Sequence, residues 1–161
     1  STGAITTRMS SGMPDLTGLS ISDVATATNV TLAADTISVI NYTGAAAATM
    51  TLPAATAGTI VVYCQSKDTT GGTATLVFDA AGSDVWATGS VIESRGSSEV
   101  TFDTSAAGET KLTFTPANAA TNLLTTGGQI AFICYENATW HIATKLAAET
   151  TQVTGAFVFA A

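Results

Sequence analysis

The chain has 161 residues, of which 31 are Thr and 29 are Ala, and it carries a net charge of -7. Charged residues make up 11 % of the chain, less than half of the about 25 % typical of soluble domains. Proteins that bind nucleic acids or anionic membrane surfaces need clustered Lys and Arg, so we expect neither as a partner. The five basic residues stand singly, at Arg8, Lys67, Arg95, Lys111 and Lys145.

The N-terminal segment, residues 1–24, is rich in Ser, Thr and Gly and shows no sustained hydrophobic period. Such a segment cannot bury enough apolar surface to offset the entropy lost on ordering, so we expect an extended arm. The first residues, 1–4, lack a basic region followed by an apolar stretch, and we expect no secretory signal. Residues 25–161 are predicted to form one domain, which this chain length favours.

Strands are predicted along nearly all of that domain, because Thr, Val and Ile suit a pleated surface. We expect long loops at 80–97 and 116–128, and no helical period persists. The predicted strands are 36–42, 49–52, 59–65, 73–79, 99–103, 111–115, 129–135, 139–145 and 153–159. Many short strands of this kind predict an all-β fold, an antiparallel β-sandwich or jelly roll with an extended N-terminal arm.

The clearest hairpin joins 129–135 to 139–145 through a turn at 136–138. Strict alternation there places Trp140 and Ile142 on one face and His141 on the other. The same alternation predicts four further inward side chains: Val100, Phe102, Leu112 and Phe114. The apolar strand 153–159 would be an aggregation hazard if left open, so we expect it to pair inside the fold or with another copy.

The two cysteines, Cys64 and Cys134, are seventy residues apart and lack zinc-finger spacing. Alternation predicts that Cys64 faces inward with Ile60 and Val62, and Cys134 inward with Ile130 and Phe132. This pattern favours buried, unreactive thiols. A disulfide between them can form only if their two Cα atoms lie within about 7 Å.

Five carboxylates fall within 25 positions: Asp79, Asp84, Glu93, Glu99 and Asp103. Paired carboxylates serve glycosidases and calcium sites, but no calcium-loop spacing occurs here. The favoured interpretation is that these carboxylates are solvated charges on loops. A hydrolase built on paired carboxylates is a further hypothesis, besides the two given at the end of this subsection. His141, the only histidine, is expected to be exposed, and no nucleophile motif accompanies it. We therefore expect no catalytic residue, no metal site and no cofactor, and a protein that is not an enzyme.

Four aromatic residues allow a sugar-stacking platform, although strand aromatics are more typical of a core. They are Tyr63, Trp86, Tyr135 and Trp140.

Two segments resemble structural proteins of tailed bacteriophages. The first is Ala48–Thr59, which reads ATMTLPAATAGT, and the second is the closing hairpin from Gly128 to Ile142. In those proteins the hairpin turn usually carries Asp-Gly, where this chain has Glu136-Asn137-Ala138. The likeness covers roughly residues 29–145. It implies a β-sandwich head protein of the capsid decoration (cement) class, often trimeric, and carries over no catalytic residue.

The resemblance therefore implies a homotrimer that binds the outer head surface of a phage and stabilises the shell by bridging major capsid protein subunits. The expected location is the outer capsid surface of the virion, after synthesis in the bacterial host cytoplasm. The residues that would contact the capsid are not assigned. The alternative is a carbohydrate- or receptor-binding module of a phage tail or fibre, which would use exposed aromatics such as Trp86 or Tyr63.

Overall fold

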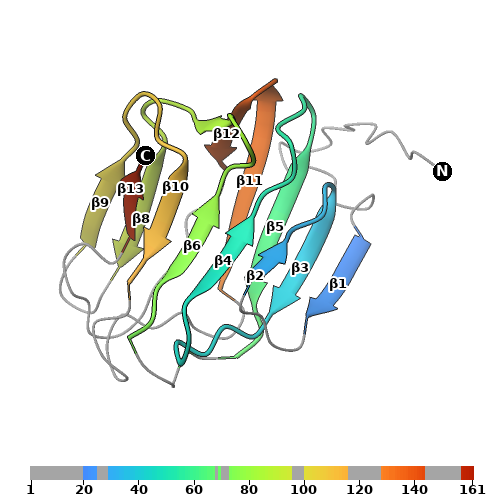
Figure 1. The fold of residues 1–161 in the computed structure, drawn as a ribbon, viewed down its shortest axis with the longest axis vertical. Coiled ribbons are helices and arrows are strands. Elements are labelled where there is room, and N and C mark those ends of the chain that lie inside the picture. The colour runs from blue at the N-terminus through green and yellow to red at the C-terminus, as the bar shows by residue number, and fades with distance from the viewer. Residues whose placement is uncertain are drawn as a thin grey trace.

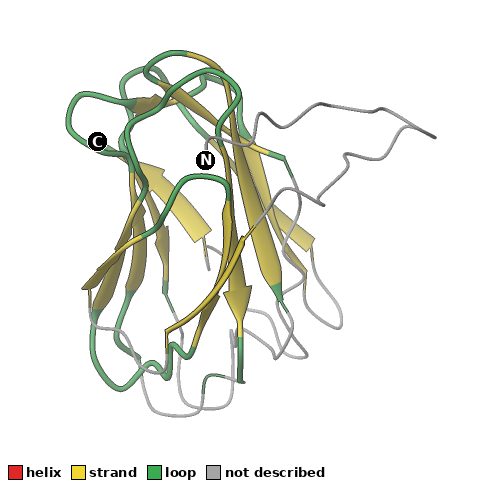
Figure 2. Cartoon of the chain, turned by 90° about the vertical axis from the view of Figure 1, so that its right-hand side faces the viewer, coloured by secondary structure: helices red, strands yellow, loops and turns green. Residues whose placement is uncertain are grey.

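The computed structural model describes residues 20–24, 29–67, 69, 73–95, 100–115, 128–143 and 157–161, and these residues form thirteen strands. The strands build two large sheets packed face to face, together with a separate hairpin (Figures 1 and 2). The prediction of an all-β sandwich is confirmed.

The first sheet has six strands in the order β1-β3-β5-β11-β12-β7. They span Ser20–Val24 (β1), Thr36–Ile40 (β3), Ile60–Gln65 (β5), Gln129–Glu136 (β11), Thr139–Ile142 (β12) and Val85–Trp86 (β7).

The second sheet has five strands in the order β13-β10-β6-β4-β2. They span Phe157–Ala160 (β13), Lys111–Phe114 (β10), Leu76–Asp79 (β6), Ala48–Thr51 (β4) and Asn29–Thr31 (β2). The separate hairpin pairs β8 (Val91–Arg95) with β9 (Val100–Thr104) and contacts β13.

Both sheets are mixed, whereas we expected antiparallel pairing throughout. Strands β1, β3 and β5 run parallel in the first sheet, and β2, β4 and β6 run parallel in the second. The cause lies in the path of the chain, which alternates between the two sheets from β1 to β6 (Figure 1). Because each crossing reverses the direction of the chain, consecutive strands of one sheet point the same way. The later strands β10, β11, β12 and β13 add by antiparallel pairing.

Two predicted boundaries need correction. Residues 20–24, which we placed in the arm, form β1 and pair with β3; residues 1–19 lie outside the described part. The predicted loop 80–97 contains β7 and β8. Neither of these strands shows enough alternation to stand out, because β7 has only two residues and three of the five residues of β8 are polar or charged. Residues 116–127 of the other predicted loop are not described.

Large side chains from both sheets meet in one core. A row of ring contacts crosses it, from Tyr63 to Phe78 (centroids 5.1 Å apart), Phe132 (5.3 Å), Trp86 (5.5 Å) and Phe159 (5.8 Å). All five rings are at most 5 % exposed. Leu112 and Phe114 also point inward as predicted; the side chains of Val100 and Phe102 lie outside the described part.

A buried glutamine holds one end of this core. The Tyr63 hydroxyl donates to Gln65 Oε1, and Gln65 Nε2 donates to the Tyr42 carbonyl over 2.7 Å. The Tyr42 hydroxyl in turn donates to the carbonyl of Ala74. Burial raises the pKa of Tyr42 to about 12 and raises the pKa of Tyr63 as well. Both phenols therefore stay neutral and hydrogen-bonded in the folded chain.

This burial predicts a specific alkaline instability. Tyr42 ionises near pH 10.0 in the unfolded chain but only near 12 in the folded one. The stability that it contributes is therefore complete below pH 10 and is lost as the pH rises through 12. Urea unfolding between pH 9 and 12 should show a steeper fall in unfolding free energy for the natural chain than for Tyr42→Phe. Equal slopes would contradict the assignment.

Candidate functional site

The two segments that carry the phage resemblance meet at one end of the sandwich. The loop from 52 to 59, between β4 and β5, lies against the turn of the β11–β12 hairpin. Ala138 N donates to the Ala55 carbonyl over 2.9 Å, and Ala57 N donates to Asn137 Oδ1 over 3.0 Å. Segments about eighty residues apart in sequence thus form one unit.

A third segment completes this unit through Asp84 and Val85. Asp84 Oδ2 accepts a hydrogen bond from Ala55 N at 2.6 Å, and Val85 N donates to the Ala138 carbonyl over 3.0 Å. Ala138 itself adopts a left-handed backbone with φ of 66°, which favours glycine. We call residues 52–59, 84–85 and 136–139 the turn cluster.

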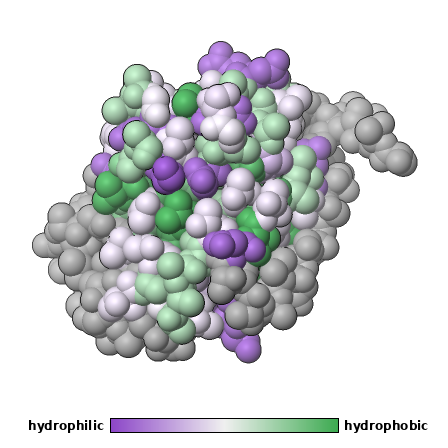
Figure 3. Space-filling view, in the orientation of Figure 1, coloured by the Kyte–Doolittle hydropathy of each residue, from purple (hydrophilic) through white to green (hydrophobic). Residues whose placement is uncertain are grey.

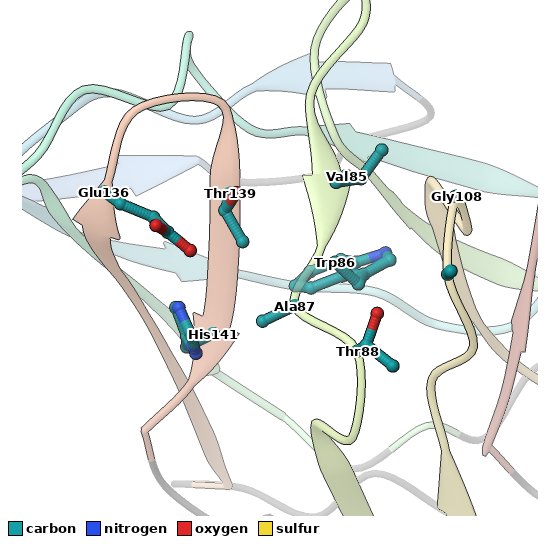
Figure 4. A pocket seen from close by; sticks show the side chains of 9 residues that line it. Val85, Trp86, Ala87, Thr88, Gly108, Glu136, Thr139 and His141 are labelled. Carbon is teal, nitrogen blue, oxygen red and sulfur yellow. The ribbon is translucent and has the colours of Figure 1, made fainter.

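A shallow pocket of about 480 Å³ opens beside the turn cluster. In Figure 4, Glu136, Thr139 and His141 extend from the hairpin on one side, while Trp86 and Thr88 lie opposite them. The complete lining is Val85, Trp86, Ala87, Thr88, Ala107, Gly108, Glu136, Thr139 and His141.

Two nitrogen atoms of the pocket residues are buried without a hydrogen-bond partner, Trp86 Nε1 and His141 Nε2. His141 was expected to be exposed. It is half-buried instead, because its ring packs edge-on against Tyr135, with centroids 4.9 Å apart. A buried polar group without a partner costs about 1–3 kcal/mol, so each nitrogen favours a water or a ligand atom that bonds to it. Neither nitrogen was predicted as part of a pocket.

The predicted carboxylates do not gather at this pocket. Asp84 holds the turn cluster, Asp103 accepts from Phe159 N at 2.5 Å, and Asp79 lies half-buried on the outward side of β6. The side chain of Glu93 and the whole of Glu99 lie outside the described part. Asp84 and Asp103 thus accept backbone hydrogen bonds, where we had expected solvated charge.

The aromatic platform is not assembled. Tyr63, Trp86 and Trp140 are fully buried in the core, which confirms the core interpretation for these three. Tyr135 alone of the four is exposed, at 66 %.

The cysteines are free and lie on opposite faces of the first sheet. Cys134 is buried as predicted, and burial raises the pKa of its thiol. Cys64 was expected to face inward with Ile60 and Val62, but Val61, Tyr63 and Gln65 take that face. The prediction was wrong because this strand is apolar on both faces, so its period does not choose between them.

The two sheets differ on their outward faces. On the second sheet the outward positions of β4, β6 and β10 are mostly polar, and they are Thr49, Thr51, Val77, Asp79, Lys111 and Thr113. On β3, β5 and β11 of the first sheet they are apolar apart from Gln129, and they are Ile37, Val39, Ile60, Val62, Cys64, Ala131, Ile133 and Tyr135. We call the latter set the apolar face. The apolar face ends at Tyr135, next to the turn cluster. On the face that Figure 3 shows, by contrast, hydrophilic and hydrophobic residues are intermixed.

Comparisons with protein-family models, with curated proteins and with solved structures find no match to this chain. Within the described ranges, no three His, Cys, Asp or Glu side chains group as metal ligands. No helix in the described part is long and apolar enough to span a membrane.

The turn cluster predicts a specific role for Asp84. Asp84→Ala should lower the free energy of unfolding by about 1–3 kcal/mol, because Ala55 N loses its acceptor. Asp79→Ala is the matched control and should change stability by no more than about 0.5 kcal/mol. Urea unfolding of both variants tests this, and equal effects would contradict the role of Asp84.

Proposed function

We propose that this protein is a phage capsid decoration protein, which binds the outer head surface and stabilises the shell by bridging major capsid protein subunits. The observation that carries the proposal is the union of the two resembling segments in the turn cluster. The hydrogen bonds between them give a physical reason for both segments to occur in one chain. We also propose that the protein is a homotrimer and not an enzyme.

The apolar face suits contact with a larger lattice. Its side chains are partly exposed apart from the buried Val62 and the exposed Tyr135, and tyrosine is enriched among residues that dominate binding energy. Tyr135 is exposed and lies where the apolar face meets the turn cluster. Three linked copies would gain about 10²–10⁴ in avidity over one copy, so each single contact can be weak.

Mass spectrometry of purified virions and cryo-EM of their heads test the proposal. We expect the protein at high copy number on the head exterior. Absence from the particle would overturn the proposal, and a low copy number confined to the tail would favour the alternative below.

Tyr135→Ala should reduce occupancy on heads about tenfold or more, as loss of an interface anchor does. The matched control is Val91→Ala, which removes an exposed apolar side chain of β8, outside the apolar face. Occupancy is measured by cryo-EM of heads incubated with each purified variant. Equal occupancy of the two variants would contradict the role of Tyr135.

The second candidate is a carbohydrate- or receptor-binding module of a phage tail or fibre, favoured by the unpartnered Trp86 Nε1 and His141 Nε2 at the pocket. A glycan hydroxyl can accept a hydrogen bond from Trp86 Nε1, and another hydroxyl can form a hydrogen bond with His141 Nε2. On a glycan array we then expect binding that His141→Ala weakens and Val91→Ala leaves intact. Absence of binding by the natural chain would remove this candidate.

A further inference from the structure

Strand β13 is held in a groove formed by distant parts of the chain. It pairs antiparallel with β10 at the edge of the second sheet and contacts the β8–β9 hairpin (Figure 1). The strand before it in sequence, β12, belongs to the first sheet. The groove is therefore built without any residue next to β13 in the chain.

The groove accepts two aromatic side chains at alternate positions. Phe157 and Phe159 are 2 % and 5 % exposed, and their rings lie 5.0 Å from Phe114 and 5.8 Å from Trp86. Val158 between them points outward and is 45 % exposed. The groove thus selects an extended segment of the pattern Phe-x-Phe.

The groove also bonds to both backbone edges of that segment. On one edge, Thr110 N donates to the Ala160 carbonyl over 2.9 Å, beyond the ladder with β10. On the other edge, Asp103 Oδ2 accepts from Phe159 N at 2.5 Å, a charge-assisted bond. Backbone pairing on one side with alternating side-chain pockets is how proteins bind an added β-strand.

We propose that this groove binds β13 of a second copy as well as that of its own chain, so that copies link by strand exchange. The fourteen residues from 143 to 156 connect β12 to β13, and fourteen residues can span up to about 50 Å when extended. Every contact described above is the same whether β13 comes from the same chain or another, which is the condition for swapping.

Concentration decides between the two arrangements. A connection of this length gives the chain's own β13 an effective concentration of about 1 mM at the groove, so exchange between copies becomes competitive near that concentration. A crowded array of copies would therefore favour linkage, and a dilute solution would favour the closed arrangement, in which each groove holds β13 of its own chain. This inference concerns the purified chain and does not rest on the proposed function.

Crosslinking between two full-length variants tests the exchange. Thr113 and Val158 are Cα partners on the outward side of β10 and β13, within the spacing that a disulfide needs. Chains carrying Thr113→Cys and chains carrying Val158→Cys, both with Cys64→Ser, are mixed at about 1 mM and oxidised. Heterodimers are then identified by mass. Since each chain has only one of the two cysteines, a 113–158 disulfide forms only between copies.

We expect at least about tenfold more heterodimer than in a control mixture where the second cysteine is Ala106→Cys, in an exposed turn outside the groove. Excess peptide 153–161 should abolish the heterodimer, and the same peptide with Phe157→Ala and Phe159→Ala should not. Heterodimer at the control level would overturn the proposal, especially if a chain carrying both cysteines crosslinks within itself. Equal competition by the two peptides would also overturn it.

Discussion

The row of aromatic rings between the sheets is the contact on which the rest of the structure depends. A sandwich core is about 10 Å thick and must be filled by side chains from both layers. In a chain dominated by Thr and Ala, only 11 residues are Phe, Tyr or Trp. Five of them form this one row, which passes from the first sheet to the second, back to the first, and then to the second again. The position of Trp86 in the row explains why a strand as short as β7 is kept at the sheet edge.

The alternating path of the chain accounts for the shape built around that row. Parallel neighbours need a long connection, and here the connection is a strand of the opposite sheet. The six strands from β1 to β6 therefore wind as a flattened coil, with one turn for every two strands. The remaining strands extend both sheets away from this coil. The turn cluster lies where a crossing of the coil, the loop from β4 to β5, meets the hairpin added later.

Sequence reasoning was accurate where one face of a strand is polar. The Lys-Leu-Thr-Phe pattern of β10 and the Trp140-His141-Ile142 pattern of β12 gave the correct inward residues. It was wrong for β5, where apolar residues occupy both faces and the inward Gln65 is satisfied by contacts that no local pattern encodes. The direction of strand pairing could not be predicted either. Turns between strands of one sheet and connections between the two sheets are built from the same residue types. The pocket depends on long-range packing of β7 against the hairpin, and the sequence carries no signal for that packing.

The late position of β13 in the sequence has a consequence for synthesis. Phe157 and Phe159 complete the core beside Phe114 and Trp86, yet they are synthesised after every other described strand. Until then one flank of the nascent sandwich exposes apolar side chains and an unpaired strand edge, the features that recruit chaperones or drive aggregation. The low charge of the chain gives little repulsion against such association. The interval between synthesis of β12 and synthesis of β13 is therefore the period in which the chain is most exposed to association with other chains.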